Sequence, residues 1–246
     1  MCLSKGMTII TEADPAKLAR KGAAIFSRIA VESVALRGRF VVAISGGSTP
    51  RPMNRMLCEE PHLSAIPWKR THIFWVDERC VPVNDPANNY GTARADFIDK
   101  IPIPDNQVHP MPVDLAPEEG ATAYQEELFR LFQTQPREIP VLDLICLGIG
   151  TDGHTASLFP GQRALNEQER LVVPVRGGDP DISRLTMTFP ILNNAREILF
   201  LVSGTGKAMI LKEILEGPPS RFPAQIIHPL HGKLTWLLDR DAASTY

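Results

Sequence analysis

The sequence predicts an α/β protein of Rossmann-like architecture, in which a mostly parallel sheet is covered by helices on both faces. Short runs rich in Val, Ile and Leu alternate along the chain with amphipathic stretches of helical spacing. Strands that are separated by helices pair in parallel, and a parallel sheet is buried on both faces. The chain has 246 residues, of which 43% are apolar, and this suits a single domain over residues 1–246.

Five apolar runs predict the buried strands. Each run is short and is bounded by glycine, proline or charged residues. The runs are Arg39–Ser45, Thr71–Asp77, Val141–Gly148, Glu197–Ser203 and Lys233–Leu238. Two further segments, Leu171–Val175 and Arg184–Phe189, show a weaker form of the same pattern.

Helical spacing predicts the elements between these strands. The first helix has Asp14 as a candidate N-cap and Pro15 at the first helical position, where a proline is well tolerated. The predicted helices cover residues 15–36, 116–132 and 206–215.

Composition and charge exclude several classes of partner. The net charge of −2 provides no broad basic field for nucleic acid, although a local cationic pocket can still bind a small anion. No apolar run reaches the length of about 18 residues that a membrane-spanning helix needs, and the first residues lack the apolar stretch of a secretion signal. We therefore expect no membrane partner and a cytoplasmic location.

The cysteines show no metal-binding or disulfide pattern. None forms a C-x-x-C pair, and each stands beside apolar neighbours or within a strand-like run, so we expect free thiols. These residues are Cys2, Cys58, Cys80 and Cys146.

Polar clusters follow four of the predicted strands directly, at residues 45–50, 77–79, 148–154 and 203–207. In an open parallel sheet, ligands bind at the carboxyl ends of the strands. The four clusters therefore predict one shared pocket.

The segment Ser45–Pro50, with the sequence SGGSTP, predicts a phosphate-binding loop. Gly46 and Gly47 allow a tight turn and a close approach of the backbone to a ligand. Either Ser48 or Thr49 can cap the short helix that follows, and free backbone N–H groups at a helix start favour an anion. A plain strand-to-helix turn is the alternative.

Two glycine-rich segments imitate nucleotide motifs. Residues 148–153 match G-x-G-x-x-G, but Pro160 and Gly161 follow too soon for the long helix of a dinucleotide site. Residues 203–208 are close to a P-loop, yet Ala208 replaces the Ser or Thr that binds Mg²⁺. Neither segment predicts a nucleotide site.

Three charged or titratable side chains near strand ends are candidates for chemistry. His154 can accept a proton near neutral pH, and Asp152 can orient its imidazole. Arg79 can bind phosphate or stabilise developing negative charge, with Asp77 and Glu78 beside it. A structural histidine and a surface ion network are the alternatives.

Other basic residues carry weaker signals. Lys207 stands at the start of a predicted helix and offers a point charge for one phosphate, unless it is a solvated surface lysine. His228 and His231 form H-x-x-H with Pro229 between them and no third ligand nearby, so no metal site is expected there.

Taken together, these motifs resemble the 6-phosphogluconolactonase family, within the glucosamine-6-phosphate isomerase/deaminase superfamily. SGGSTP is shared with the deaminases, whereas the long segment around His154 is more specific to the lactonases. The matching segments occur in the family's order: SGGSTP at 45–50, VDERCVP at 76–82, NNYG at 88–91, LGIGTDGHTASLFPG at 147–161 and SGTGKA at 203–208.

The resemblance implies hydrolysis of a small phosphosugar lactone, 6-phospho-D-glucono-1,5-lactone, to 6-phosphogluconate, without a metal or organic cofactor. It implies that His154 is the general base and Asp152 its neighbour. The implied substrate or phosphate contacts are the loop Ser45–Thr49, Arg79, Asn89, Lys207 and, more weakly, Arg184. One departure is Asn88, at a position where relatives often carry Ser.

Two rival functions remain at this point. The first is a sugar-phosphate isomerase or deaminase on the same fold. Deaminases of this superfamily place a carboxylate a few residues beyond the histidine, whereas here no acid follows His154 until Glu167. The second is a sugar-phosphate sensor without catalysis, since one fold can serve many functions. The oligomeric state is left open.

Overall fold

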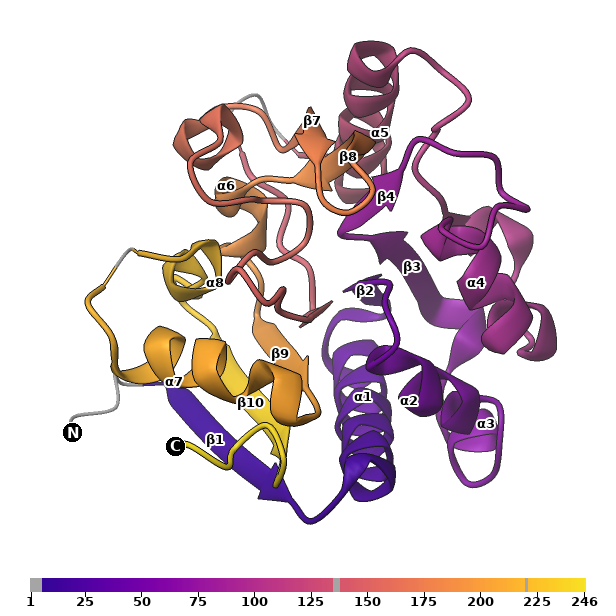
Figure 1. The fold of residues 1–246 in the computed structure, drawn as a ribbon. Helices are drawn as coiled ribbons and strands as arrows, with labels where there is room; N and C mark the ends of the chain where they lie inside the picture. The colour runs from indigo at the N-terminus through magenta and orange to yellow at the C-terminus, as the bar shows by residue number, and fades with distance from the viewer. Residues whose placement is uncertain (1–5, 135–137, 220) are drawn as a thin grey trace.

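A computed structural model describes residues 6–134, 138–219 and 221–246 (Figure 1). Its main sheet has seven strands in the order β1-β10-β9-β6-β2-β3-β5, and every neighbouring pair is parallel. This confirms the predicted α/β class. The strands are β1 (Met7–Glu12), β2 (Phe40–Ile44), β3 (Thr71–Trp75), β5 (Val108–His109), β6 (Leu144–Leu147), β9 (Glu197–Val202) and β10 (Lys233–Asp239).

All five predicted strands are present, and the two strands that were not predicted, β1 and β5, form the edges of the sheet. A central strand such as β2 is buried along its whole length and has a continuous apolar sequence. The edge strand β1 consists of partly buried and exposed residues, and β5 has only two residues. Edge strands therefore lack the apolar run by which the central ones are recognised.

Helices cover both faces of this sheet. Phe26 of α1 (Pro15–Arg37) packs edge-on against Phe40, with ring centroids 5.3 Å apart. Tyr124 of α5 (Pro117–Phe132) contacts Phe74, which is in register with Ala43. Ala43 lies three positions from Phe40 in β2, so Phe40 and Phe74 point to opposite faces.

The sequence signals at the first helix are confirmed. The Asp14 carboxylate accepts a 2.7 Å hydrogen bond from the backbone N–H of Lys17, and Gly38 ends the helix in the left-handed conformation. The remaining helices are α2 (Pro50–Leu57), α3 (His62–Ala65), α4 (Asn89–Asp96), α6 (Phe189–Leu192), α7 (Ala208–Glu216) and α8 (Pro223–Ile226).

A small antiparallel sheet stands next to the carboxyl end of β3. It consists of β4 (Asp77–Arg79), β8 (Ile182–Met187) and β7 (Val172–Gly177), in the order β4-β8-β7 (Figure 1). Its strands β7 and β8 correspond to the two weaker predicted segments. Asp77 was expected at the end of a long strand 71–77, but it begins this second sheet instead. The change of sheet brings Arg79 opposite Arg184.

Three of the cysteines, Cys58, Cys80 and Cys146, are free thiols, and Cys2 lies outside the described residues. Within the described ranges, no helix is both long and apolar enough to cross a membrane.

Candidate active site

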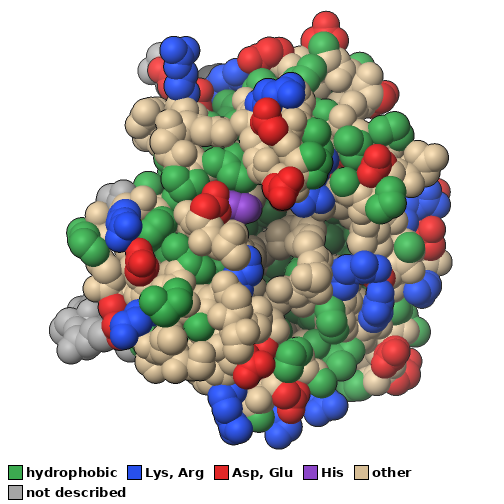
Figure 2. Space-filling view, viewed as in Figure 1, with side chains coloured by type: hydrophobic (Ala, Val, Ile, Leu, Met, Phe, Trp, Pro, Cys, Tyr) green, Lys and Arg blue, Asp and Glu red, His purple; other side chains and the backbone are tan. Residues whose placement is uncertain are grey.

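A cavity of about 190 Å³ lies at the carboxyl ends of β2, β6 and β9, beside β4 and β8. Figure 2 shows this face of the molecule hollowed near its centre. The four polar clusters of the sequence meet there, as predicted. The predicted site residues on its wall are Ser45, Gly46, Gly47, Ser48, Thr49, Arg79, Asn89, His154, Arg184 and Lys207.

The loop after β2 has the form that its glycines suggest. Gly47 has a φ of 91°, a conformation that side-chain-bearing residues rarely adopt. A Cβ on Gly46 would lie 1.8 Å from Oδ1 of Asn89, so only glycine fits against that side chain. The hydroxyl of Ser45 is buried and has no hydrogen-bond partner among the described residues. A buried polar group without a partner is unusual and is available to a ligand.

The expected side-chain cap of the following helix is absent. Thr49 occupies the N-cap position of α2, but its side chain makes no capping hydrogen bond. Its backbone already has the helical conformation, whereas a capping side chain is typical of an extended N-cap residue. The first N–H groups of α2 are therefore left without the cap that the sequence suggested.

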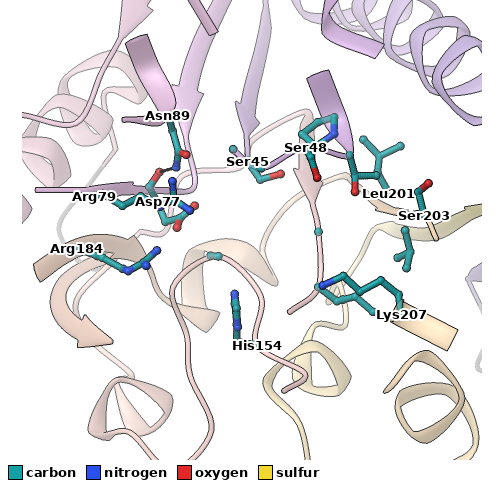
Figure 3. Close-up of a pocket in the computed structure, with 18 residues that line it drawn as sticks. Ser45, Ser48, Asp77, Arg79, Asn89, His154, Arg184, Leu201, Ser203 and Lys207 are labelled. Atoms are coloured by element: carbon teal, nitrogen blue, oxygen red, sulfur yellow. Dashed lines mark hydrogen bonds between the residues drawn. The ribbon is translucent and has the colours of Figure 1, made fainter. Parts of the chain in front are cut away.

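Two arginines form one side of the pocket (Figure 3). Arg79 and Arg184 are paired across β4 and β8. Nε of Arg184 donates to the carbonyl oxygen of Gly177 at 2.8 Å, and Nη1 of Arg79 donates to that of Ala87 at 2.6 Å. Burial lowers the pKa of Arg184, and the neighbouring Arg79 lowers it further. A buried and a partly buried positive charge on neighbouring strands favour an anion between them.

Asp77 provides a carboxylate on the same side of the cavity. It is 6% exposed, and its Oδ2 accepts a 2.6 Å hydrogen bond from the hydroxyl of Ser157. Asn89 fixes the backbone at this point, because its Nδ2 donates to the carbonyl oxygen of Asp77 at 2.9 Å. The arginines therefore share this wall with an acceptor that suits sugar hydroxyl groups.

His154 lies between the arginines and Lys207 (Figure 3). Its Nδ1 is 2.6 Å from Oδ1 of Asp152. When Nδ1–H donates to this carboxylate, the other ring nitrogen, Nε2, is left free to accept a proton. A Cβ on Gly150 would lie 2.1 Å from the same Nδ1, so this glycine makes room for the pair. The ring of Phe159, 4.7 Å away between centroids, packs against the imidazole.

Asp152 is not among the residues that line the cavity, and its carboxylate contacts His154 on the Nδ1 side of the imidazole. Burial favours a higher pKa for the Asp152 carboxyl, but the charge and hydrogen bonds of His154 outweigh burial and hold that pKa below its usual value. The carboxylate therefore stays ionised beside the imidazole. This is the arrangement expected of a histidine that becomes cationic during a reaction.

Lys207 faces His154 from the start of α7. Burial lowers the pKa of its ammonium group, and Asp152 partly compensates. The preceding loop is held by Asp239, whose carboxylate accepts hydrogen bonds from the Ser203 hydroxyl and from the N–H of Gly204. Asp239 is fully buried.

Sequence reasoning missed Asp239 and Ser157 as parts of this site. Asp239 directly follows the predicted strand 233–238, so its position after a strand was a usable signal. Ser157 had none, because only the fold brings its hydroxyl to Asp77. Two histidines outside the site, His72 and His109, contact each other, with Nδ1 of His72 3.0 Å from Nε2 of His109.

Comparison with known proteins identifies the family of the chain. Residues 13–236 match the family model of glucosamine-6-phosphate isomerases/6-phosphogluconolactonase. The 6-phosphogluconolactonase of Synechocystis sp. is 44% identical over 215 residues, which is 86% of each chain. That of Rattus norvegicus is 41% identical over 214 residues, covering 84% of this chain and 80% of the other.

Solved structures show the same likeness. The 6-phosphogluconolactonase from Trypanosoma cruzi superposes with a TM-score of 0.87 at 30% identity, covering 98% of this chain and 97% of that one. A monomeric glucosamine-6-phosphate deaminase superposes with a TM-score of 0.82 at 22% identity, covering 98% of this chain and 100% of that one, and this similarity shows the shared fold alone. The chain therefore belongs to the glucosamine-6-phosphate isomerase/6-phosphogluconolactonase family.

Proposed function

We propose that this protein hydrolyses 6-phospho-D-glucono-1,5-lactone to 6-phospho-D-gluconate, the second step of the oxidative pentose phosphate pathway. The observation that carries the proposal is the contact of Asp152 with His154, which lines a cavity together with three cationic side chains and the loop Ser45–Thr49. The two lactonase relatives, at 44% and 41% identity, support this choice of substrate.

The reaction needs one group that both removes and returns a proton. Nε2 of His154 takes a proton from water as the water oxygen attacks C1 of the lactone. The carbonyl oxygen becomes an oxyanion, which a neighbouring cation or backbone N–H group stabilises. When the bond between C1 and the ring oxygen breaks, the imidazolium returns its proton to the leaving oxygen. Asp152 stabilises the imidazolium in the interval.

Binding of the 6-phosphate fixes the position of the ring. The loop Ser45–Thr49 and the cations Arg79, Arg184 and Lys207 line the cavity and together favour an anionic substrate. Contacts to a phosphate that lies away from C1 chiefly orient the carbonyl carbon toward the water. A lactone is an activated ester, and the enzyme therefore has to lower a smaller barrier than a peptidase does.

The deaminase alternative fits the site less well. The segment after His154 carries no acid, and its polar side chains are already engaged: Thr155 donates to the carbonyl oxygen of Gly148, and Ser157 donates to Asp77. Isomerisation and deamination require several coordinated proton transfers, including one at carbon. Lactone hydrolysis requires only activation of water and protonation of the leaving group.

The test is a rate measurement on freshly prepared 6-phosphogluconolactone. The acid released is followed with and without the purified protein, because the lactone also opens spontaneously. We expect a rate proportional to protein concentration. A rate equal to the buffer blank at every protein concentration contradicts the proposal, and ligand binding without turnover identifies a sensor.

A further inference from the structure

Glu78 lies between two residues of the pocket wall but is not itself on that wall. Successive side chains of a strand point to opposite sides, so Asp77 and Arg79 face the cavity while Glu78 turns away from it. The side chain of Glu78 is in the interior, at 1% exposure. A carboxylate is rarely buried so completely without partners.

Three backbone N–H groups are its partners. Oε1 accepts from Arg79 at 2.8 Å and from Asn89 at 2.7 Å, and Oε2 accepts from Tyr90 at 2.8 Å. Asn89 and Tyr90 are the first two residues of α4, whose N–H groups have no partner within the helix. Glu78 thus accepts hydrogen bonds from the first two N–H groups of α4. A negative charge is favourable at this end of a helix.

These hydrogen bonds position two groups of the pocket at once. Asn89 is held against the phosphate loop, where its Oδ1 leaves no room for a side chain on Gly46. Arg79 is held at its backbone by Glu78 and at its guanidinium by the carbonyl oxygen of Ala87, two residues before Asn89. A shift of the α4 start relative to β4 therefore moves Arg79 and Asn89 together.

We propose that Glu78 is a positioning residue for substrate binding, which joins β4 to α4 and holds Arg79 and Asn89 at the distance that the phosphosugar requires. The inference rests on the proposed function. It assigns to Glu78 an effect on affinity through two other side chains, without contact between Glu78 and the substrate.

The protonation state of Glu78 affects the junction between β4 and α4, that is, the three hydrogen bonds that Glu78 accepts. Burial raises the pKa of the Glu78 carboxyl to about 7, against the three backbone hydrogen bonds, and the charge of Asp77 adds to the increase. A proton on the carboxyl removes the negative charge that strengthens these three hydrogen bonds and turns one oxygen into a hydroxyl. The junction is therefore complete above neutral pH and loosens as pH falls. The charged and titratable groups near Glu78 are Asp77, Arg79 and Cys80 on its own segment, Arg184 on β8 and Tyr124 on α5. Tyr90 and Arg94 on α4 and Asp114 line the same small cavity as Glu78.

The first test is the variant Glu78→Gln, which keeps the shape but replaces one oxygen by an NH2 donor. We expect KM for the lactone to rise by about tenfold, the scale of one lost hydrogen bond to a charged group, while kcat changes by less than about threefold. The matched control is Asp143→Asn. Asp143 is also a buried carboxylate that accepts a backbone N–H, from Val41 at 2.8 Å, but it lies at the opposite end of the sheet. This variant should lower the melting temperature and leave KM unchanged.

A double-mutant cycle separates positioning from a general loss of stability. If Glu78 acts through Asn89, the effects of Glu78→Gln and Asn89→Ala on KM are less than additive, whereas those of Glu78→Gln and Lys207→Ala are additive. Additive effects with Asn89→Ala, or a wild-type KM in Glu78→Gln, overturn the inference. If the wild-type protein does not accelerate lactone opening, the proposed function is wrong, and the same cycle is measured as the affinity for 6-phosphogluconate by calorimetry.

A second measurement needs no variant and covers the case in which Glu78→Gln does not fold. The backbone amide resonances of Arg79, Asn89 and Tyr90 are followed by NMR as the pH of the wild-type protein is changed. We expect these three resonances to move together around neutral pH and KM to rise as pH falls through the same midpoint. Resonances that do not move, or a KM that stays constant while they move, contradict the positioning role.

Discussion

Nδ1 of His154 lies 2.6 Å from the carboxylate of Asp152. This contact occupies Nδ1 and leaves Nε2 of the imidazole free to accept a proton. We expect His154→Ala to lower kcat by about a hundredfold or more with little change in KM, because a positioned base contributes that much. Steady-state kinetics on the lactone measures both constants. His228→Ala is the control, since His228 is exposed and outside the pocket. Near-normal turnover in His154→Ala removes this residue from the mechanism.

Gly150 provides a test of the same pair without removing either partner. An added Cβ would lie 2.1 Å from Nδ1 of His154 and 2.5 Å from the Asp152 carboxylate, so Gly150→Ala should separate them. We expect kcat to fall by at least about tenfold, since the base is then misplaced. The control is Gly206→Ala, because a Cβ on Gly206 meets nothing within 4 Å. Equal kcat values for the two variants would show that the pair is not needed.

Lys207 should act on binding more than on chemistry. We expect Lys207→Ala to raise KM with a nearly unchanged kcat, because a contact to a remote phosphate contributes equally to the ground state and the transition state. Lys212→Ala, an exposed change on the same helix, is the control. Gluconolactone without the 6-phosphate should be a much poorer substrate. Equal rates for the two lactones would contradict a phosphate site in this pocket.

Asp239 is buried beneath the loop that precedes Lys207, and it should affect both the stability of the protein and substrate binding by that loop. Its carboxylate accepts the Ser203 hydroxyl and the backbone N–H groups of Gly204 and Ala242, the last at 2.8 Å. Asp239→Asn replaces one acceptor oxygen by a donor, and we expect a loss of about 1–3 kcal/mol in the free energy of unfolding together with a higher KM. Chemical denaturation and kinetics measure the two effects. A destabilised variant with the wild-type KM would limit Asp239 to a structural role.

The lactonase and deaminase functions make opposite predictions for glucosamine-6-phosphate. We expect no ammonia release from this amino sugar, because no acid stands beside His154 in the segment Thr155–Pro160 to support further proton transfers. A coupled ammonia assay with the purified protein measures it. Protein-dependent ammonia release combined with a lactone rate equal to the blank would reverse the assignment within the family.

The sequence alone determined the sheet class, the four clusters after strand ends and most of the residues on the pocket wall. These features are local: β2 carries its apolar run and its glycine turn in one continuous segment, and the parallel sheet then places such turns at one edge. The segment around His154 was likewise predictable from the sequence, since His154, Asp152 and Gly150, the glycine that makes room for them, lie within five residues.

Only the tertiary structure decided which distant groups support those residues. Strand β4 leaves the main sheet to pair with β8, so Arg79 meets Arg184, and no periodicity in the sequence signals that pairing. Glu78 and Asp239 resemble ordinary charged residues at strand ends, yet both are buried, because Glu78 accepts from the backbone N–H of Asn89 and Asp239 from that of Gly204, 35 residues away in the sequence. The physical reason is that hydrogen-bond satisfaction of buried groups depends on the complete fold, whereas strand and turn preferences depend on neighbours along the chain.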